Sequence, residues 1–393
     1  MFIAFFYQKQ AAKIVRHRTT VSACGHKKSR VWNLLGLKFV SLANTSLTTA
    51  MEKATGRLRE KGLPGLFDLK KIWYPTWFQG NRRHNQYFEG WYIKLVSADL
   101  SQAWAFIPGV SLHHEDAHSF VQVIDGMTGQ TWYYRFPEDA FRFSKTAFQV
   151  QIDDNHFSTS GIQLSLHDST GTFKGQVNFN QLTPYKASLA RPGIMGWYRY
   201  MPFMECYHGV VSMDHEISGT LSMLDRHVDF SGGRGYMEKD WGTSMPKAWV
   251  WMQTNHFSTE GDSFMLSVAD IPWIGKTFPG FLGFIYLAGK QHVFATYTGA
   301  RITKLNKENN GVWIQIEDNK MKLEIRGEKT GNTLGKGALK APLSGQMSRI
   351  IHESMNATIH IRLTDRQDNL LFEDTGQRAG LEMVGDTSLL NTR

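Results

Sequence analysis

Apolar and polar residues alternate along most of the chain from about residue 87 onward. Three segments show this clearly, with an apolar side chain at every second position: residues 162–166, 321–325 and 357–363. Turn-forming Gly, Asn, Asp and Ser residues interrupt the alternation at residues 125–126, 169–171, 309–311 and 318–319. A period of two with turns at such spacing is typical of short antiparallel strands that bury one face. Because no helical period extends over ten residues in this region, the sequence predicts an all-β protein.

One segment, residues 181–204, has no alternation and contains Pro184, Pro192 and Pro202. We interpret it as a connecting loop between two antiparallel β-barrel or sandwich domains, residues 73–180 and residues 205–385. A chain of 393 residues exceeds the usual length of one domain and can bury two cores. Antiparallel domains of this kind hold apolar ligands in their mouths or at the seam between them.

The positive charge of the chain is concentrated at its N-terminus. The whole sequence has 44 Lys and Arg against 35 Asp and Glu, a formal net charge of +9. Residues 1–72 hold 14 of the basic residues and 3 of the acidic ones, which leaves 30 basic and 32 acidic residues in the remainder. A nucleic-acid groove needs its basic residues clustered on the folded part of a protein. We therefore expect no nucleic-acid partner.

Three interpretations of the basic extension, residues 1–72, stay open. Its first fifty residues contain no Asp or Glu and no apolar run long enough to span a membrane. The extension could be an organelle transit peptide, or a disordered basic tail. It could also be a translated stretch upstream of a true start at Met51, with a short helix following over residues 52–61. All three interpretations place the chemistry elsewhere.

Cysteine usage bears on the compartment. The two cysteines are Cys24, in the extension, and Cys206, so the rest of the chain cannot form an internal disulfide. This fits a reducing compartment, and no clear secretory signal precedes the predicted strands. We expect a cytoplasmic protein that makes transient membrane contact if its ligand is apolar. The sequence sets no oligomeric state.

Residues 232–257 combine charge and tryptophan more densely than folding alone requires. The stretch reads GGRGYMEKDWGTSMPKAWVWMQTNHF, so Glu238, Lys239 and Asp240 lie directly beside Trp241. A charge that is buried against aromatic rings without a partner costs several kcal/mol. Such surroundings shift pKa values, and shifted pKa values are common at functional sites. This stretch is therefore the candidate site.

Three motifs resemble the tocopherol cyclase family. The first is Y-F-E-G-W-Y at residues 87–92, similar to the family's F-E-G-W-Y-F signature. The second is E-K-D-W-G at residues 238–242 with Pro246 and a W-x-W-x-Q-x-N pattern after it, similar to the family's E-K-N-W-G block. Asp240 stands where the family pattern has Asn. The third is Ala341-Pro342, similar to a late A-P segment, and the motifs keep the family's order between about residues 73 and 385.

The resemblance implies both a fold and a chemistry. It implies a pair of lipocalin-like β domains, shared with carotenoid 1,2-hydratases, and a small apolar prenylated substrate as partner. Plant-type cyclases of this family add a phenol hydroxyl across a trisubstituted alkene to close a chromanol ring. That reaction is redox-neutral, so we expect no cofactor and no metal. The glycine-rich residues 327–337 lack the ending of a phosphate loop, and the H-H-E-D-A-H cluster at residues 113–118 is interpreted as an exposed loop without ligand spacing.

Protonation of an alkene requires a desolvated acid, and burial raises the pKa of a carboxyl group. The resemblance points to Glu238 as this acid, because carotenoid hydratases carry an Asp in its slot, and to Tyr236 as a match to their nearby Tyr. Glu205 and His208 resemble a polar pair opposite this turn, and His208 could accept the phenol proton. The remaining candidates would bind the substrate, the rings by stabilising a tertiary cation. They are Trp91, Glu89, Tyr207, Lys239, Asp240, Trp241, Trp249 and Trp251.

Plainer interpretations stay open beside these. Glu238 and Lys239 could form a solvated pair at a strand end, and His208 could be a structural histidine. Each tryptophan could belong to the core, and Glu89 could bond to a neighbouring strand. Asp240 could carry the proton in place of Glu238.

Three functional hypotheses follow. The first is a tocopherol cyclase-like intramolecular lyase or isomerase that acts on a prenylated quinol or a related isoprenoid. The second is an isoprenoid or carotenoid hydratase, which would use the same acid and add water. The third is a lipocalin-like carrier of an apolar ligand that does no chemistry.

Overall fold

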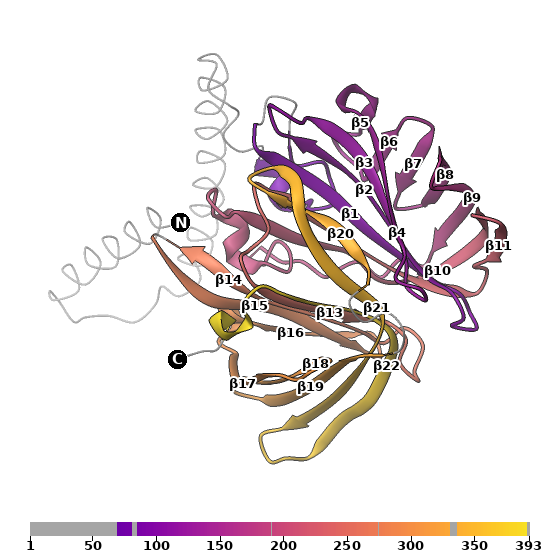
Figure 1. Cartoon of the computed structure of the whole chain (residues 1–393). Coiled ribbons are helices and arrows are strands. Elements are labelled where there is room, and N and C mark those ends of the chain that lie inside the picture. Colours follow the sequence, from indigo (N-terminus) through magenta and orange to yellow (C-terminus); the bar gives the residue numbers. More distant parts are fainter. Residues whose placement is uncertain (1–68, 81–84, 190, 274, 331–335, 391–393) are drawn as a thin grey trace, which may run out of the picture. The chain divides into compact units, whose positions relative to one another are not determined.

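Antiparallel strands in two sheets dominate the computed structural model, which describes residues 69–80, 85–189, 191–273, 275–330 and 336–390 (Figure 1). Within these ranges the only helical elements are short 3-10 helices: η1 (Leu69–Ile72), η2 (Glu138–Ala140), η3 (Gly196–Tyr200), η4 (Thr296–Thr298) and η6 (Thr387–Leu390). The prediction of an all-β protein built from antiparallel sheets is therefore confirmed. The expected helix over residues 52–61 and the start at Met51 lie outside the described residues.

The first sheet has twelve strands in the described part of the chain. Their order is β4-β3-β2-β1-β12-β10-β9-β8-β7-β6-β5, and β11 pairs with β10. The strands are β1 (Tyr87–Val96), β2 (Ala103–Leu112), β3 (His118–Asp125), β4 (Thr131–Pro137), β5 (Phe141–Phe143), β6 (Gln149–Ile152), β7 (Asn155–Ser158), β8 (Gly161–Asp168), β9 (Gly171–Asn180), β10 (Cys206–Met223), β11 (Arg226–Asp229) and β12 (Gly233–Gly242).

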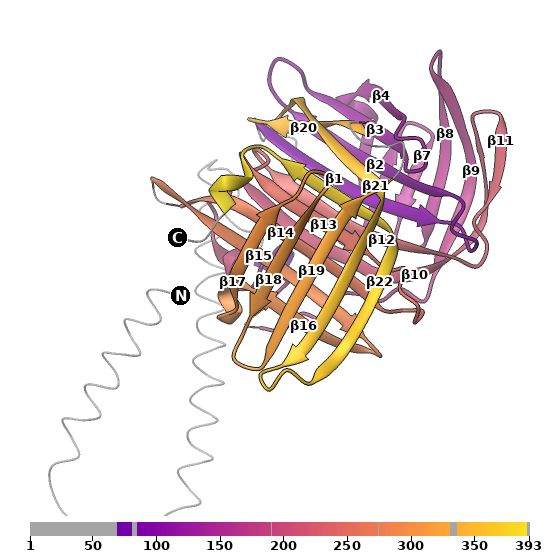
Figure 2. The same cartoon turned by 60° about the horizontal axis from the view of Figure 1, so that its bottom comes forward.

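The second sheet has ten strands among the described residues, in the order β16-β15-β14-β13-β22-β21-β19-β18-β17, and β20 pairs with β21. The strands are β13 (Trp249–Thr254), β14 (Ser263–Trp273), β15 (Lys276–Leu287), β16 (Lys290–Ala295), β17 (Arg301–Lys307), β18 (Gly311–Glu317), β19 (Met321–Lys329), β20 (Ala338–Leu343), β21 (Gln346–Asp365) and β22 (Leu370–Val384). Figure 2 shows β17, β18, β19 and β22 of this sheet running beside one another.

The alternation read from the sequence predicts the buried faces correctly. Along β8, β19 and β21 the alternating apolar residues point into a core, and the residues between them are more exposed. The interruptions at residues 125–126, 169–171, 309–311 and 318–319 coincide with strand ends, between β3 and β4, β8 and β9, β17 and β18, and β18 and β19. A period of two therefore located both the strands and their turns.

The two sheets bury three apolar cores, of which one lies between the sheets. One lies inside the first sheet and contains Trp104 and Phe173, and a second lies inside the second sheet and contains Ile314 and Ile361. The third lies between the sheets, and its members come from strands of both. The sheets therefore bury apolar side chains on both faces near their contact, and this contact is where a ligand site can form.

The change from one sheet to the other comes later in the chain than the sequence suggested. The expected connecting loop, residues 181–204, joins β9 to β10, and these two strands pair within the first sheet. The chain passes to the second sheet between Gly242 and Trp249, so residues 206–242 belong with the first sheet and not with the second. Proline and glycine correctly indicated an irregular segment. That segment is a long loop between two strands that pair with each other. Both sheets lie within one compact unit, Asp68–Arg393, and the division into domains 73–180 and 205–385 stays a prediction.

A hairpin of the second sheet reaches over the first. In Figure 1, β20 and the start of β21 lie over β1 and its neighbours. The amide of Gln122 on β3 bonds twice to the backbone of Lys340, with its Nε2 donating at 2.9 Å and its Oε1 accepting at 2.8 Å. Ser111 Oγ on β2 donates to the carbonyl of Gly345 at 2.7 Å. The third family motif, Ala341-Pro342, therefore lies on a hairpin that closes the space between the sheets.

No helix in the described ranges is long and apolar enough to cross a membrane.

Candidate active site

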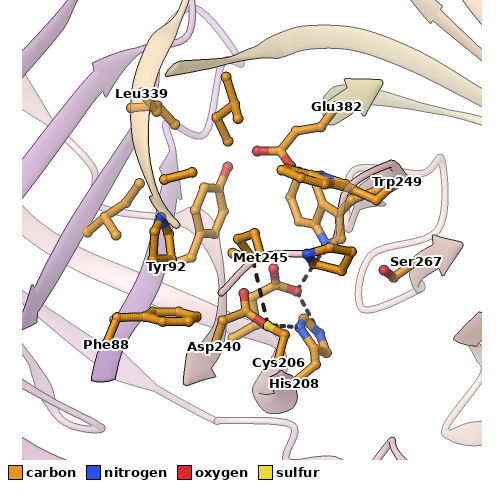
Figure 3. A pocket seen from close by; sticks show the side chains of 18 of the residues that line it. Phe88, Tyr92, Cys206, His208, Asp240, Met245, Trp249, Ser267, Leu339 and Glu382 are labelled. Atoms are coloured by element: carbon orange, nitrogen blue, oxygen red, sulfur yellow. Dashed lines mark hydrogen bonds and ion pairs between the residues drawn. The ribbon is translucent and has the colours of Figure 1, made fainter. Parts of the chain in front are cut away.

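A cavity of about 1120 Å³, part of it open to solvent, lies between the two sheets. Its walls are mainly apolar and aromatic, and they come from β1–β3, β10, β12, β13–β15 and the β20–β21 hairpin. Its polar lining includes His208, Glu238 and Asp240 from the first sheet, Glu353 and Glu382 from the second, and Tyr92 from β1. Figure 3 shows His208, Asp240 and Cys206 on one side of this space and Glu382 with Trp249 on the other. A few polar groups in an apolar hollow are typical of sites for apolar ligands.

The alternation of β12 divides the E-K-D-W motif between two environments. Glu238 and Asp240 face the cavity, whereas Lys239 and Trp241 face the core of the first sheet. Side chains of a strand alternate between the two faces of its sheet, so adjacent residues in the motif cannot share a site. The interpretation of Glu238 and Lys239 as a solvated pair is therefore wrong, because both are buried and they point in opposite directions.

His208 lies between the two cavity-facing carboxylates of β12. Its Nδ1 bonds to Asp240 Oδ1 at 2.9 Å, and its Nε2 is 3.3 Å from Glu238 Oε2, close but not aligned for a hydrogen bond. Burial lowers the pKa of His208, but the charges of Glu238 and Asp240 outweigh it and raise the pKa to about 10. At neutral pH His208 is therefore an imidazolium held between two carboxylates.

Glu238 also accepts hydrogen bonds from two neutral aromatic side chains. Tyr236 Oη donates to its Oε2 at 2.6 Å, and Trp251 Nε1 donates to the same oxygen at 3.3 Å. Glu238 is 4% exposed. Tyr236, Glu238, His208, Asp240 and Trp251, all named from the sequence, are thus brought together.

Two carboxyl groups on the opposite wall, Glu353 on β21 and Glu382 on β22, were not found from the sequence. Tyr92 Oη donates to Glu353 Oε1 at 2.5 Å, and Trp249 Nε1 donates to Glu382 Oε2 at 2.6 Å. Burial raises the pKa of both carboxyl groups, and for Glu382 the neighbouring charge of Glu353 raises it further. A signal for Glu353 did exist, since it occupies an inward position of β21 that its neighbours Ile351 and Met355 fill with apolar side chains.

On the other face of β12, Lys239 forms a sealed ion pair with Glu89. Its Nζ bonds to Glu89 Oε1 and donates to the carbonyl of Trp77 at 2.7 Å, and it lies 4.6 Å from the ring of Trp91 and 4.8 Å from that of Trp241. Both charged side chains are completely buried. Burial lowers the pKa of Lys239 to about 8 although Glu89 opposes this, so the amine stays charged at neutral pH.

The carboxylate of Glu89 is saturated by donors. The backbone N–H groups of Gln79 and Gly80 donate to it at 2.9–3.1 Å, and Tyr87 Oη donates at 2.5 Å. These contacts tie the segment before β1 to the first sheet. None of the residues around this pair lines the cavity between the sheets.

Five predicted substrate-binding residues therefore lie away from the cavity: Glu89, Trp91, Tyr207, Lys239 and Trp241. The alternation along their strands turns them to the opposite face of the sheet, and their role in substrate binding stays a prediction. Glu205 is exposed and precedes β10, so it does not join His208 in the cavity. Trp249 and Trp251 do line it.

Two further groups bear on metal binding. His208, Glu238 and Asp240 could each offer one ligand atom within 4.8 Å of the others. To bind all three to one ion, the imidazole of His208 would have to give up its contact with a carboxylate. In the 113–118 cluster His118 is buried and bonds to the carbonyl of Asp116 and to Tyr133 Oη, both at 2.6 Å, so the exposed loop that we expected has a buried end.

The fold and site define an all-β protein of two antiparallel sheets with a carboxyl-lined, mainly apolar cavity between them. The sequence profile of the family described as tocopherol cyclase-like matches residues 174–385, which is more than half of the chain. The chain belongs to this family.

Two plant proteins are similar to the chain. A protein of Oryza sativa subsp. japonica described as a probable chloroplastic tocopherol cyclase is 27% identical over 135 residues, which cover 31% of this chain and 28% of that protein. A chloroplastic tocopherol cyclase of Zea mays is 22% identical over 199 residues, which cover 48% of this chain and 41% of that protein. The matched regions span less than half the length of either relative.

Solved structures with a similar arrangement of strands have low sequence identity. One is a Nitrosomonas europaea protein assigned as AttH, at 13% identity and a TM-score of 0.47, which covers 76% of this chain and 92% of that one. Another is kievitone hydratase of Nectria haematococca, at 9% identity and a TM-score of 0.45, which covers 76% of this chain and 89% of that one.

Proposed function

We propose that this protein catalyses the ring closure of a prenylated quinol or a related isoprenoid, as its family and its relatives' names suggest. In this reaction a hydroxyl oxygen adds to an alkene of the prenyl tail. One C–O bond forms, the alkene carbon gains a proton, and the hydroxyl loses one, so the product is an isomer of the substrate. The site must therefore supply a proton donor, a proton acceptor and an apolar space that tolerates a tertiary cation.

The single observation that carries this proposal is Glu238, a buried carboxyl group that faces a mainly apolar cavity and is held by donors. Tyr236 and Trp251 donate to it, and the His208 imidazolium lies beside it. Both donors and the imidazolium meet at Oε2, so this oxygen is held as an acceptor. A carboxylate held in this way is placed to take the hydroxyl proton.

This assignment reverses the roles that the resemblance suggested. His208 was expected to accept the proton, but its raised pKa keeps it protonated at neutral pH, and an imidazolium has no free lone pair. We assign His208, held by Asp240, the role of orienting Glu238 and balancing its charge.

The rings of Trp249 and Trp251 would stabilise the cation. Both line the cavity and come from β13, opposite the acidic end of β12. A cation over an aromatic face gains about 0.5–2 kcal/mol per ring. A substrate of this class partitions into lipid, so we extend the proposal to transient contact with a membrane surface during substrate uptake.

Incubation of the purified protein with a prenyl quinol, followed by mass spectrometry and chromatography, tests the proposal. We expect a product of unchanged mass from the native protein, and a loss of about 10²–10⁴-fold in turnover for Glu238→Gln. Glu328→Gln, which changes an exposed glutamate of β19, is the control and should retain full turnover. Full turnover by Glu238→Gln would remove Glu238 from the mechanism.

The same measurement separates the alternatives. A product heavier by one water would replace cyclisation with hydration. Binding of the quinol without any product would replace catalysis with a carrier function.

A further inference from the structure

The opposite wall of the cavity carries two glutamates on adjacent strands. Glu353 of β21 and Glu382 of β22 are direct register partners in the antiparallel ladder. Directly opposed residues have their Cβ atoms about 4.5–5.5 Å apart on the same face of the sheet. Both line the cavity, and Figure 3 shows the carboxyl group of Glu382 directed into it. The charge of Glu353 is one of the causes that raise the pKa of Glu382, because like charges on neighbouring carboxyl groups repel.

Each glutamate is anchored through one oxygen. Tyr92 holds Oε1 of Glu353, and Trp249 holds Oε2 of Glu382. The other oxygen of Glu353, Oε2, is buried and finds no hydrogen-bond partner among the described residues, and the residue as a whole is only 1% exposed. An unsatisfied buried carboxylate oxygen is costly, whereas a carboxylic acid can place a proton there or accept one from a neighbouring acid. The orphaned oxygen thus indicates that a proton resides on this pair.

We propose that Glu353 and Glu382 share one proton and form the acid that protonates the substrate alkene. This inference rests on the proposed function and adds the proton donor that Glu238, as acceptor, cannot be. The O–H bond of the shared carboxylic acid breaks as a C–H bond forms on the alkene. The hydroxyl oxygen of the substrate then forms the C–O bond and gives its proton to Glu238. One proton has entered and one has left the substrate, and exchange with solvent at the open part of the cavity restores both carboxyl groups.

The charges around the pair agree with this role. The carboxylates of Glu238 and Asp240 face it across the cavity, and His208 lies between them. Lys94 of β1 and Lys329 of β19 oppose protonation, but Lys94 is itself buried and bonds to Gln253 Oε1 at 2.9 Å. Burial lowers the pKa of Lys94 to about 7, which weakens its opposition. Burial in turn raises the pKa of both glutamates, so the pair holds its proton toward neutral pH.

Two variants test the pair, Glu353→Gln and Glu382→Gln. Glutamine has the shape of a neutral carboxyl group, so each variant should fold at pH 7 with its stability close to native. We expect turnover of a prenyl quinol to fall about 10²–10⁴-fold in each variant. Glu373→Gln, on the outer part of β22, is the matched control and should keep native turnover. Native turnover in both cavity variants would overturn the proposal.

Infrared spectroscopy gives a measurement that is independent of turnover. At pH 7 the native protein should show the C=O stretch of a protonated, buried carboxyl group, and each glutamine substitution should remove it. The band should also disappear as the pH is raised, in step with the loss of turnover. A native spectrum without this band at pH 7 would overturn the inference even if the quinol is cyclised, and the proposed function would then stand with another acid. If the band is present and no quinol reacts, the pair holds its proton but donates it to no such alkene, and both the donation and the proposed function fail.

Discussion

The two faces of β12 place similar residues in opposite situations. On one face Lys239 and Glu89 form a completely buried pair, in which backbone N–H groups donate to Glu89 and Lys239 donates to a backbone carbonyl. On the other face Glu238, Asp240 and His208 form a charged group that borders a cavity. The first arrangement leaves no charge without a partner, and the second leaves a carboxylate accessible to a ligand.

The comparison shows how a structural charged group can be told from one placed to act on a ligand. Both groups are buried among tryptophans, so burial and aromatic neighbours do not distinguish them. They differ in whether they border the cavity. A charged group that contacts only other protein groups can affect stability, but it cannot contact a ligand. Charge at the cavity should therefore govern activity and its pH dependence, and charge in the sealed core should govern folding.

The largest effect should come from removing one member of the sealed pair. Lys239→Met leaves Glu89 buried without a counter-charge, and we expect the free energy of unfolding to fall by about 3–5 kcal/mol. The double variant Lys239→Met, Glu89→Gln removes both charges, keeps an acceptor for Gln79 and Gly80, and should recover most of that loss. Urea unfolding at pH 7 measures both. Equal destabilisation by the single and double variants would mean that the pair is not an electrostatic unit.

A smaller effect should appear in the pH dependence of stability at the cavity face. The pKa of His208 is about 10 in the folded protein and near 6.5 when unfolded, so the folded state binds the extra proton between these values. Its stabilisation is complete below about pH 6.5 and is lost as the pH rises through about 10. From pH 6 to pH 10 the native protein should therefore lose on the order of 4 kcal/mol more than His208→Gln. Denaturant unfolding of both proteins from pH 6 to pH 10 measures this difference. If the free energy of unfolding changes equally with pH in the native protein and in His208→Gln, His208 is not held as an imidazolium.

The smallest effects should separate the tryptophans of the two faces. Trp249→Phe removes the N–H that holds Glu382 and changes a cavity wall, so the KM for a prenyl quinol should rise about 3–10-fold, or roughly 1 kcal/mol. Trp91→Phe alters a ring that stacks on Phe148 in the sealed core, so it should lower stability by about 1–2 kcal/mol. Its KM should stay native. The reverse pattern would mean that the ligand binds in the first sheet.

The sequence was sufficient for the strands but not for their grouping. Alternation located β8, β19 and β21 because one face of each is buried in a core. It could not place β10 to β12, since pairing between distant strands depends on registers that no local pattern records. Proline-rich residues 181–204 look like a link between domains, yet a long excursion between two paired strands has the same composition.

For the candidate site, the sequence pointed to β12 but did not separate the two faces of that strand. Naming Glu238, Lys239 and Trp241 together treated neighbours in sequence as neighbours in space. Glu353 and Glu382 were missed for the opposite reason, because they are about 115 residues or more from the motif and meet it only where the two sheets pack. A glutamate at an inward position of an alternating strand was the one local sign of the first of them.

The β20–β21 hairpin connects cavity walls that come from segments far apart in the chain. Residues 88–122 supply one wall, the strands after residue 205 supply the charged groups, and the hairpin at residues 338–351 fastens one to the other through Gln122 and Ser111. The region that the family profile matches begins only at residue 174. Glu238 lies on the first sheet and Glu353 and Glu382 lie on the second, so recombination that exchanged either sheet alone would separate these carboxyl groups.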